Sequence, residues 1–246
     1  MENILKNPAV TSKNHAAPTW GGVYRVGGLS LAAGGILYLI GSTINFYFGS
    51  GTPGNDLAYL QALGAHPGIS QLIYWCYLLA DIFFIPATLA LYLALKEINK
   101  NVMLIAAGFL GVFIILDLGI TEPNSLALVA LAHSLATTTT EVQRTIYQAA
   151  ANWGLATMPI ATFFSWIGPS IGFLIASMLM RKSMFSKSTA FLGIIVYSVA
   201  IVASFYFLFP APVLGILLTP ILWLYGIWLI KAGRELFKAG RPPIAA

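Results

Sequence analysis

Long apolar stretches alternate with short polar connections along the whole chain. Six of them are long enough to cross a bilayer as helices, because a spanning helix needs about 20 predominantly apolar residues. They cover 26–48, 69–95, 102–120, 153–180, 189–209 and 213–230. The pattern therefore predicts an all-α integral membrane bundle of about six transmembrane helices.

The segment between the third and fourth stretches, 121–152, is less regular. Residues 125–136 are apolar but too few to span, so they predict an extra helical segment on the outer side. Three arrangements stay open for it: an extension of the third helix, a helix in the membrane interface, or a re-entrant segment. Thr140-Glu141-Val142-Gln143 has the sequence of a capping box, which predicts a new helix running into the fourth crossing.

Basic residues lie on alternate connections. Of the 13 Lys and Arg residues, only Arg144 lies outside the N-terminal segment, the second and fourth connections, and the C-terminal end. Because Lys and Arg are retained on the cytoplasmic side, this bias predicts a multi-pass protein of the cytoplasmic membrane with both termini inside. We expect a flexible cytoplasmic arm over 1–22, a six-helix transmembrane domain over 23–232 and a short basic cytoplasmic tail over 233–246.

Composition supports lipid as the solvent. The chain is 58% hydrophobic and only 9% charged, whereas soluble domains carry about 25% charged residues. The topology already explains the net charge of +5, so nucleic acid is not expected as a partner. The expected partners are the lipid bilayer and either another membrane protein or further copies of this chain.

Two acidic residues lie inside the predicted crossings, Asp81 in the second and Asp117 in the third. A charged side chain at the bilayer centre costs about 2.5–3.5 kcal/mol on insertion scales, so such residues are functional candidates. Helical spacing places Tyr74 and Tyr77 on the face of Asp81, and Thr121 on the face of Asp117.

These polar residues gather in the outer half of the predicted bundle. The candidate pocket residues are Asp81, Tyr77, Tyr74, Asp117, Thr121, Asn45 and Ser165. One interpretation is a pocket open to the outside with Asp81 at its floor, suited to a cation, a proton or a small polar molecule. The other is that each carboxyl group bonds a Tyr or Thr of a neighbouring helix and serves packing.

Motifs of common enzymes and cofactor sites are missing. The chain has no H-E-x-x-H, G-x-S-x-G, Walker or G-x-G-x-x-G sequence. No second His, Cys or carboxylate stands at ligand spacing from His133, so no metal site is expected there. Glu122 is expected at the outer interface of the membrane. We therefore predict no catalytic residues, no metal site and no cofactor.

Four stretches, in order along nearly the whole chain, carry a resemblance to a known family. They are Arg25 with 34–41, then 89–96, then 179–185 with 191–193, and 228–233. In these stretches the chain resembles DUF4386, a family of uncharacterised multi-pass membrane proteins of prokaryotes. The resemblance implies a six-helix bundle and supplies neither an activity nor catalytic residues.

Three functions remain in view. The first is a non-catalytic protein that binds a small ligand or serves as an accessory subunit of a membrane complex, because no catalytic constellation is present. The second is a small transporter or channel that uses Asp81. The third is an intramembrane enzyme acting on lipid or quinone with Asp81 or Asp117 as its acid or base.

Overall fold

The structure is a computed structural model that describes residues 20–48 and 57–241. Within these two ranges every regular element is helical. Six helices are long and apolar enough to cross a membrane, which confirms the all-α multi-pass bundle expected from the sequence.

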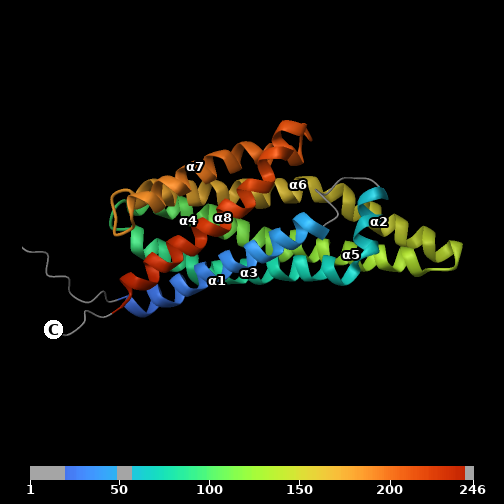
Figure 1. Cartoon of the computed structure of the whole chain (residues 1–246), viewed down its shortest axis with the longest axis horizontal. Helices are drawn as coiled ribbons and strands as arrows, with labels where there is room; N and C mark the ends of the chain where they lie inside the picture. Colours follow the sequence, from blue (N-terminus) through green and yellow to red (C-terminus); the bar gives the residue numbers. More distant parts are fainter. Residues whose placement is uncertain (1–19, 49–56, 242–246) are drawn as a thin grey trace, which may run out of the picture.

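The spanning helices keep the predicted order, with small shifts at their ends (Figure 1). They are α1 (Gly21–Phe48), α3 (Pro67–Leu95), α4 (Lys100–Leu116), α6 (Glu141–Met180), α7 (Lys187–Ser204) and α8 (Pro212–Ala239). Four shorter elements complete the fold: α2 (Leu57–Ala65), the π-helical turn η1 (Asp117–Thr121), α5 (Glu122–Thr137) and the 3-10 turn η2 (Phe205–Phe207).

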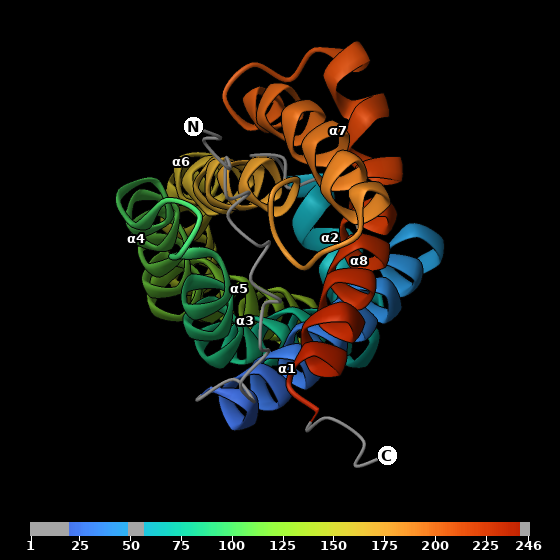
Figure 2. The same ribbon diagram turned by 90° about the vertical axis from the view of Figure 1, so that its left-hand side faces the viewer.

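The spanning helices form a closed ring. α1 packs on α3, α3 on α4, α4 on α6, α6 on α7 and α7 on α8, and α8 returns to α1. Figure 2 shows this order from one end of the bundle. Every spanning helix therefore has two neighbours, and the space at the centre of the ring is enclosed on all sides by helices.

The basic connections meet at one end of the ring, which we call the basic end. Lys96, after α3, lies over the ring of Trp20, just before α1, with Nζ 5.8 Å from the ring centre. The backbone N–H of Ser186, before α7, donates to Glu235 Oε2 near the end of α8 at 2.8 Å. The second and fourth connections thus lie at the same end, as the charge pattern predicts.

An aromatic cluster fills the centre of the bundle over the half of its length nearest the basic end. We call this half the basic half. Phe84 is completely buried and packs against Phe113, Phe173 and Tyr225, with ring centres 5.7–6.5 Å apart. Tyr197, Trp228 and Phe173 continue the cluster with ring centres 4.9–5.3 Å apart. Such offset and edge-to-face pairs are favourable and leave little free space.

Glycines of α1 allow two close helix contacts, as membrane helices often require. A Cβ at Gly34 or Gly41 would meet α3, at 3.4 Å from Ala80 O and 2.9 Å from Tyr77 Cε1. A Cβ at Gly35 would lie 2.8 Å from Gly226 O of α8. Gly27, Gly34 and Gly41, which are seven residues apart, therefore pack on α3, and Gly35 packs on α8.

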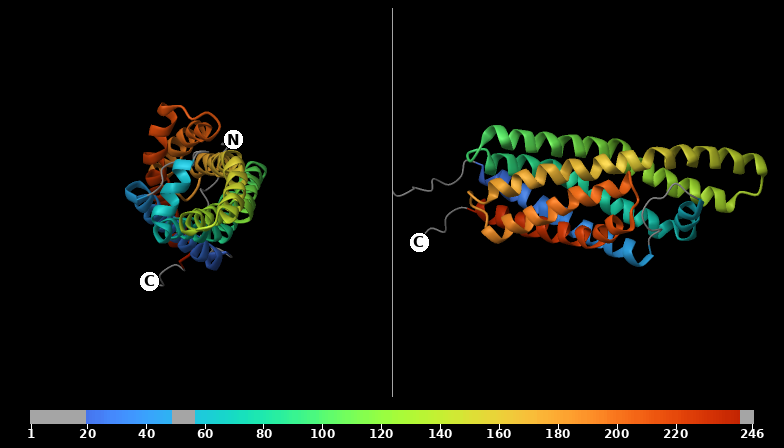
Figure 3. Two further views of the ribbon diagram at one scale, coloured as in Figure 1. Left: turned by 90° about the vertical axis from the view of Figure 1, so that its right-hand side faces the viewer. Right: turned by 90° about the horizontal axis from the view of Figure 1, so that it is seen from above.

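The segment 125–136 extends the third crossing. α4, η1 and α5 form one 38-residue helical rod, Lys100–Thr137. At 1.5 Å per residue, the 40-residue α6 is about 60 Å long, twice the hydrocarbon thickness. α5 and the start of α6 therefore project as a hairpin beyond the other helices (Figure 3, right).

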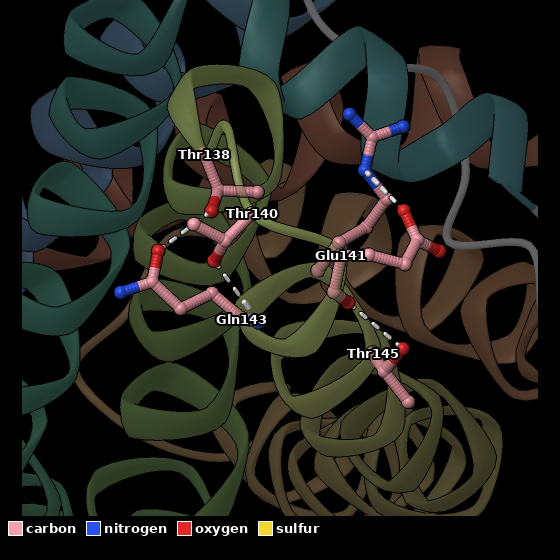
Figure 4. A network of polar contacts seen from close by, with 6 residues as sticks. Thr138, Thr140, Glu141, Gln143 and Thr145 are labelled. Atoms are coloured by element: carbon pink, nitrogen blue, oxygen red, sulfur yellow. Dashed lines mark hydrogen bonds and ion pairs between the residues drawn. The ribbon is translucent and has the colours of Figure 1, made fainter.

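The turn of this hairpin contains the predicted N-terminus of α6. Thr140 is the N-cap, and its Oγ1 accepts from the backbone N–H of Gln143 at 3.4 Å. The Gln143 side chain accepts instead from the Thr138 hydroxyl at 3.0 Å, and the Thr145 hydroxyl donates to the Glu141 carbonyl (Figure 4). The helix begins where the sequence predicts, with half of the reciprocal capping box in place.

Three details differ from the expectations or lie outside them. The sequence pattern missed α2, whose nine residues are too short to span and pack against α5. The basic tail expected from 233 begins within α8, which continues to Ala239 because its last turns still bury Leu236. Most of the expected N-terminal arm, 1–19, and the turn-rich connection 49–56 lie outside the described residues.

Candidate functional site

A cavity of about 370 Å³ occupies the centre of the bundle over the half of its length farther from the basic end. We call this half the cavity half. Each of the six spanning helices contributes to its wall, together with η1, α5 and η2. Its inner limit is the aromatic cluster, through Phe113 and Tyr225. It extends outward to Phe46 near the end of α1, a side chain that is 55% exposed.

The wall combines acidic, hydroxyl and aromatic groups. Among the described residues that line it, Asp117 and Glu122 are acidic and none is Lys, Arg or His. Its other hydrogen-bonding side chains are Ser42, Asn45, Thr121, Ser125, Thr162, Ser165, Ser170 and the aromatic Tyr38, Tyr74, Tyr77, Tyr225, Trp166 and Trp223. The cavity is therefore polar and carries acidic groups without a basic counterpart.

The π-helical turn brings the two acidic residues to the same wall. In η1 the backbone N–H of Glu122 donates to the carbonyl of Asp117, five residues earlier. Pro123 explains why the turn widens here, since proline has no N–H and its ring clashes with the carbonyl four residues before it. The wider turn places Asp117, Thr121 and Glu122 together on the cavity wall, a common use of such turns.

Hydrogen bonds fix this wall to its neighbours. The hydroxyls of Thr121 and Ser165 lie 2.7 Å apart and join η1 to α6. The Ser125 hydroxyl donates to the Thr121 carbonyl at 2.8 Å. Farther along the hairpin, Asn124 Nδ2 donates to the Gly154 carbonyl at 3.1 Å. These contacts hold the acidic wall in position. They leave one carboxyl oxygen of Asp117 and one of Glu122 without a hydrogen bond.

Several buried oxygens on the wall have no partner among the described residues. They are Oγ of Ser42, Oδ1 of Asp117, Oε2 of Glu122 and Oγ1 of Thr162. These residues are 3%, 5%, 7% and 7% exposed. Both salt bridges among the described residues lie on the exterior, Lys96–Glu97 and Arg144–Glu141, so neither buried acid is paired with a basic side chain.

Asp81 does not lie at the floor of the pocket, where the sequence led us to expect it. It is completely buried but does not line the cavity, because Tyr38 of α1 stands between them. The Tyr38 hydroxyl donates to Asp81 Oδ1 at 2.8 Å, and Oδ2 has no partner. This contact is the kind that the packing interpretation expects, a carboxyl group bound to a tyrosine of a neighbouring helix.

The other six candidate residues all line the cavity: Asn45, Tyr74, Tyr77, Asp117, Thr121 and Ser165. The sequence interpretation missed Glu122, because five-residue spacing from Asp117 falls on different faces of a regular α-helix. It also missed Tyr38 and Ser42. Their spacing of seven and three residues from Asn45 places them on its face and is the signal that could have found them.

The arrangement is suited to holding a positive charge. Unpartnered carboxyl oxygens attract a cation or a hydrogen-bond donor, and aromatic faces attract cations through their quadrupole. No group of three or more His, Cys, Asp and Glu residues within the described ranges is placed to hold a metal ion. The wall offers carboxyl, hydroxyl and aromatic groups to a ligand.

Comparison with known proteins supplies no relative from which to transfer a function. No family model, curated protein or solved structure matches the chain. What can be stated of the class is structural: the chain folds as a multi-pass helical membrane protein with a polar cavity in one half of its bundle.

Proposed function

We propose that this protein binds a small cationic solute in the cavity half of its transmembrane bundle. The observation that carries the proposal is the pair of buried acids, Asp117 and Glu122, on the wall of a cavity of about 370 Å³ whose described lining residues include no basic one. Acidic side chains within a membrane are expensive unless something compensates them. A cationic solute supplies that compensation when it binds.

Thermal unfolding of the detergent-solubilised protein tests this proposal with a panel of sodium, calcium, ammonium, choline and phenethylamine. At least one of these cations should raise the unfolding temperature, because a ligand that binds only the folded state stabilises it. The rise should disappear in the double variant Asp117→Asn/Glu122→Gln. It should persist in Glu97→Gln/Glu141→Gln, which alters two exposed acids by the same chemistry. A panel without any effect, or an effect that survives in the first double variant, would contradict the proposal.

Transport of the bound solute is the second candidate. Pro169 lies within α6 on the cavity wall, and Pro220 lies within α8. Each proline removes a backbone hydrogen bond from its helix, and interrupted helices beside a central site are typical of transporters. The test is uptake of the stabilising cation by proteoliposomes, which Asp117→Asn should abolish.

The same uptake assay separates the roles of the acids. Asp81→Asn retains an acceptor for Tyr38, so unchanged uptake in this variant would remove Asp81 from the transport cycle. The resemblance to DUF4386 stays a prediction and adds no activity to either candidate.

A further inference from the structure

The placement of acidic and aromatic groups on the cavity wall indicates the chemical class of the solute. We propose that the ligand is a protonated organic amine with a compact apolar or aromatic body. This inference rests on the proposed cation-binding function and adds the substrate class to it. Three properties of the wall carry it: unpartnered carboxyl oxygens, aromatic rings on the helices around the acids, and a volume too large for a single ion.

The acceptors require a ligand with N–H groups. Asp117 Oδ1 and Glu122 Oε2 are buried and have no donor in the described part of the chain, and the Thr162 hydroxyl on the same cavity wall is also unpartnered. A primary ammonium group brings three N–H donors and one positive charge. A quaternary ammonium ion has the charge without the donors, and would leave these oxygens unbonded at a cost to affinity.

Apart from Phe113 of α4, the aromatic residues of the wall lie on elements outside the rod that carries the acids. Tyr38 belongs to α1, Tyr77 to α3, Trp166 to α6, and Trp223 and Tyr225 to α8, whereas Asp117 and Glu122 belong to the α4–η1–α5 rod. Tyr38 packs against both Tyr77 and Tyr225, with ring centres 5.4 and 5.3 Å apart. An amine whose head binds the acids therefore directs its body toward a continuous aromatic surface.

Size separates this ligand from an inorganic ion. A calcium ion is bound by six to eight oxygens at short range, mainly from carboxylates, and the described residues contain no cluster of three or more His, Cys, Asp or Glu. A cavity of about 370 Å³ falls within the usual range for organic ligands, about 300–1,000 Å³. Its mixture of rings with a few polar groups also fits that class of site.

Equilibrium dialysis of the natural full-length chain in detergent tests the inference with three related probes. Phenethylamine has the ring, the charge and the N–H donors. Benzyltrimethylammonium has the ring and the charge, and phenethyl alcohol has the ring alone. We expect affinity to fall in that order, by about tenfold or more between the first and the last, since a tenfold change corresponds to one charge-assisted hydrogen bond.

Variants of two tryptophans on α6 test the aromatic wall. Trp166→Leu should weaken phenethylamine binding about three- to tenfold, the range of a cation–π contact, and Trp166→Phe should restore most of it. Trp153→Leu is the matched control, because Trp153 is 71% exposed and does not line the cavity, and it should leave binding unchanged.

The outcomes distinguish this inference from the function on which it rests. Sodium or calcium stabilisation that depends on Asp117 and Glu122, without phenethylamine binding, would overturn the amine class and keep the cation site. Binding of phenethyl alcohol as tight as that of phenethylamine would overturn the amine class as well. Absence of every acid-dependent cation effect would overturn both proposals.

Discussion

The two halves of the helix ring enclose different interiors. In the basic half, rings of Phe84, Phe173, Tyr197 and Trp228 fill the centre at close contact. In the cavity half, the same helices surround a hollow with two buried acids and several hydroxyls. Unpartnered hydroxyls occur in both halves. Three buried acids of the described chain have an unpartnered carboxyl oxygen: Asp117 and Glu122 line the cavity, and Asp81 lies behind Tyr38. The comparison suggests that the basic half supplies the rigidity and that the cavity half supplies the function, as stability and function often diverge.

The largest effect should come from the centre of the aromatic cluster. Phe84→Ala removes a completely buried ring that packs against four other rings, and should reduce the free energy of unfolding by about 3 kcal/mol. Denaturant or thermal unfolding in detergent measures the change. The neighbouring Phe83 is 37% exposed, so Phe83→Ala should cost far less. Equal losses in the two variants would refute the view that the aromatic cluster stabilises the bundle.

A smaller loss of stability is expected at the boundary between the two halves, where Tyr38 bonds Asp81. Tyr38→Phe removes the 2.8 Å hydrogen bond to Asp81 and leaves both carboxyl oxygens of a fully buried acid without a partner. We expect a loss of about 1–3 kcal/mol in the same unfolding assay. Asp81→Asn keeps an oxygen acceptor for Tyr38 and should lose less. A Tyr38→Phe protein as stable as the natural one would show that this bond does not hold the boundary.

Removing the acids of the cavity half should raise the free energy of unfolding, whereas the two changes above lower it. Asp117→Asn/Glu122→Gln removes two acidic groups whose buried oxygens Oδ1 and Oε2 lack partners. In the absence of ligand, this double variant should be more stable than the natural chain by about 1 kcal/mol while losing cation binding. The exposed pair Glu97→Gln/Glu141→Gln should change stability by less than about 0.5 kcal/mol. A destabilised Asp117/Glu122 variant would indicate that the acids serve packing, as the alternative interpretation of the sequence holds.

The sequence was sufficient for the features that local composition determines. Apolar length places the six crossings, the Lys and Arg residues mark one end of the bundle, and the Thr140 cap starts α6 where expected. The nine-residue α2 was missed because it is apolar but too short to span, and its packing on α5 depends on the tertiary fold.

The site was only partly predictable, for reasons of helix geometry. Glu122 reaches the cavity because η1 is a π-helical turn, whereas regular helical spacing directs it away from Asp117. Asp81 and Tyr77 share a helical face, yet only Tyr77 lines the cavity, because the side chain of Tyr38 from another helix covers Asp81. A local π-helical turn decided the first position and a contact with a helix distant in the sequence decided the second, and regular helical periodicity contains neither.

Modification of two matched cysteines tests the contrast between the halves most directly. Ser42 lines the cavity and Ser177 lies in the basic half, and both are serines less than 5% exposed. In a Cys76→Ala background, Ser42→Cys and Ser177→Cys would be treated with two methanethiosulfonates, one carrying trimethylammonium and one carrying sulfonate. A water-accessible acidic cavity predicts that the preference of Ser42→Cys for the cationic reagent exceeds that of a free thiol in solution by about tenfold or more, and that Ser177→Cys reacts with neither. A preference at Ser42→Cys no greater than that of the free thiol, or equal reactivity of the two cysteines, would contradict the account.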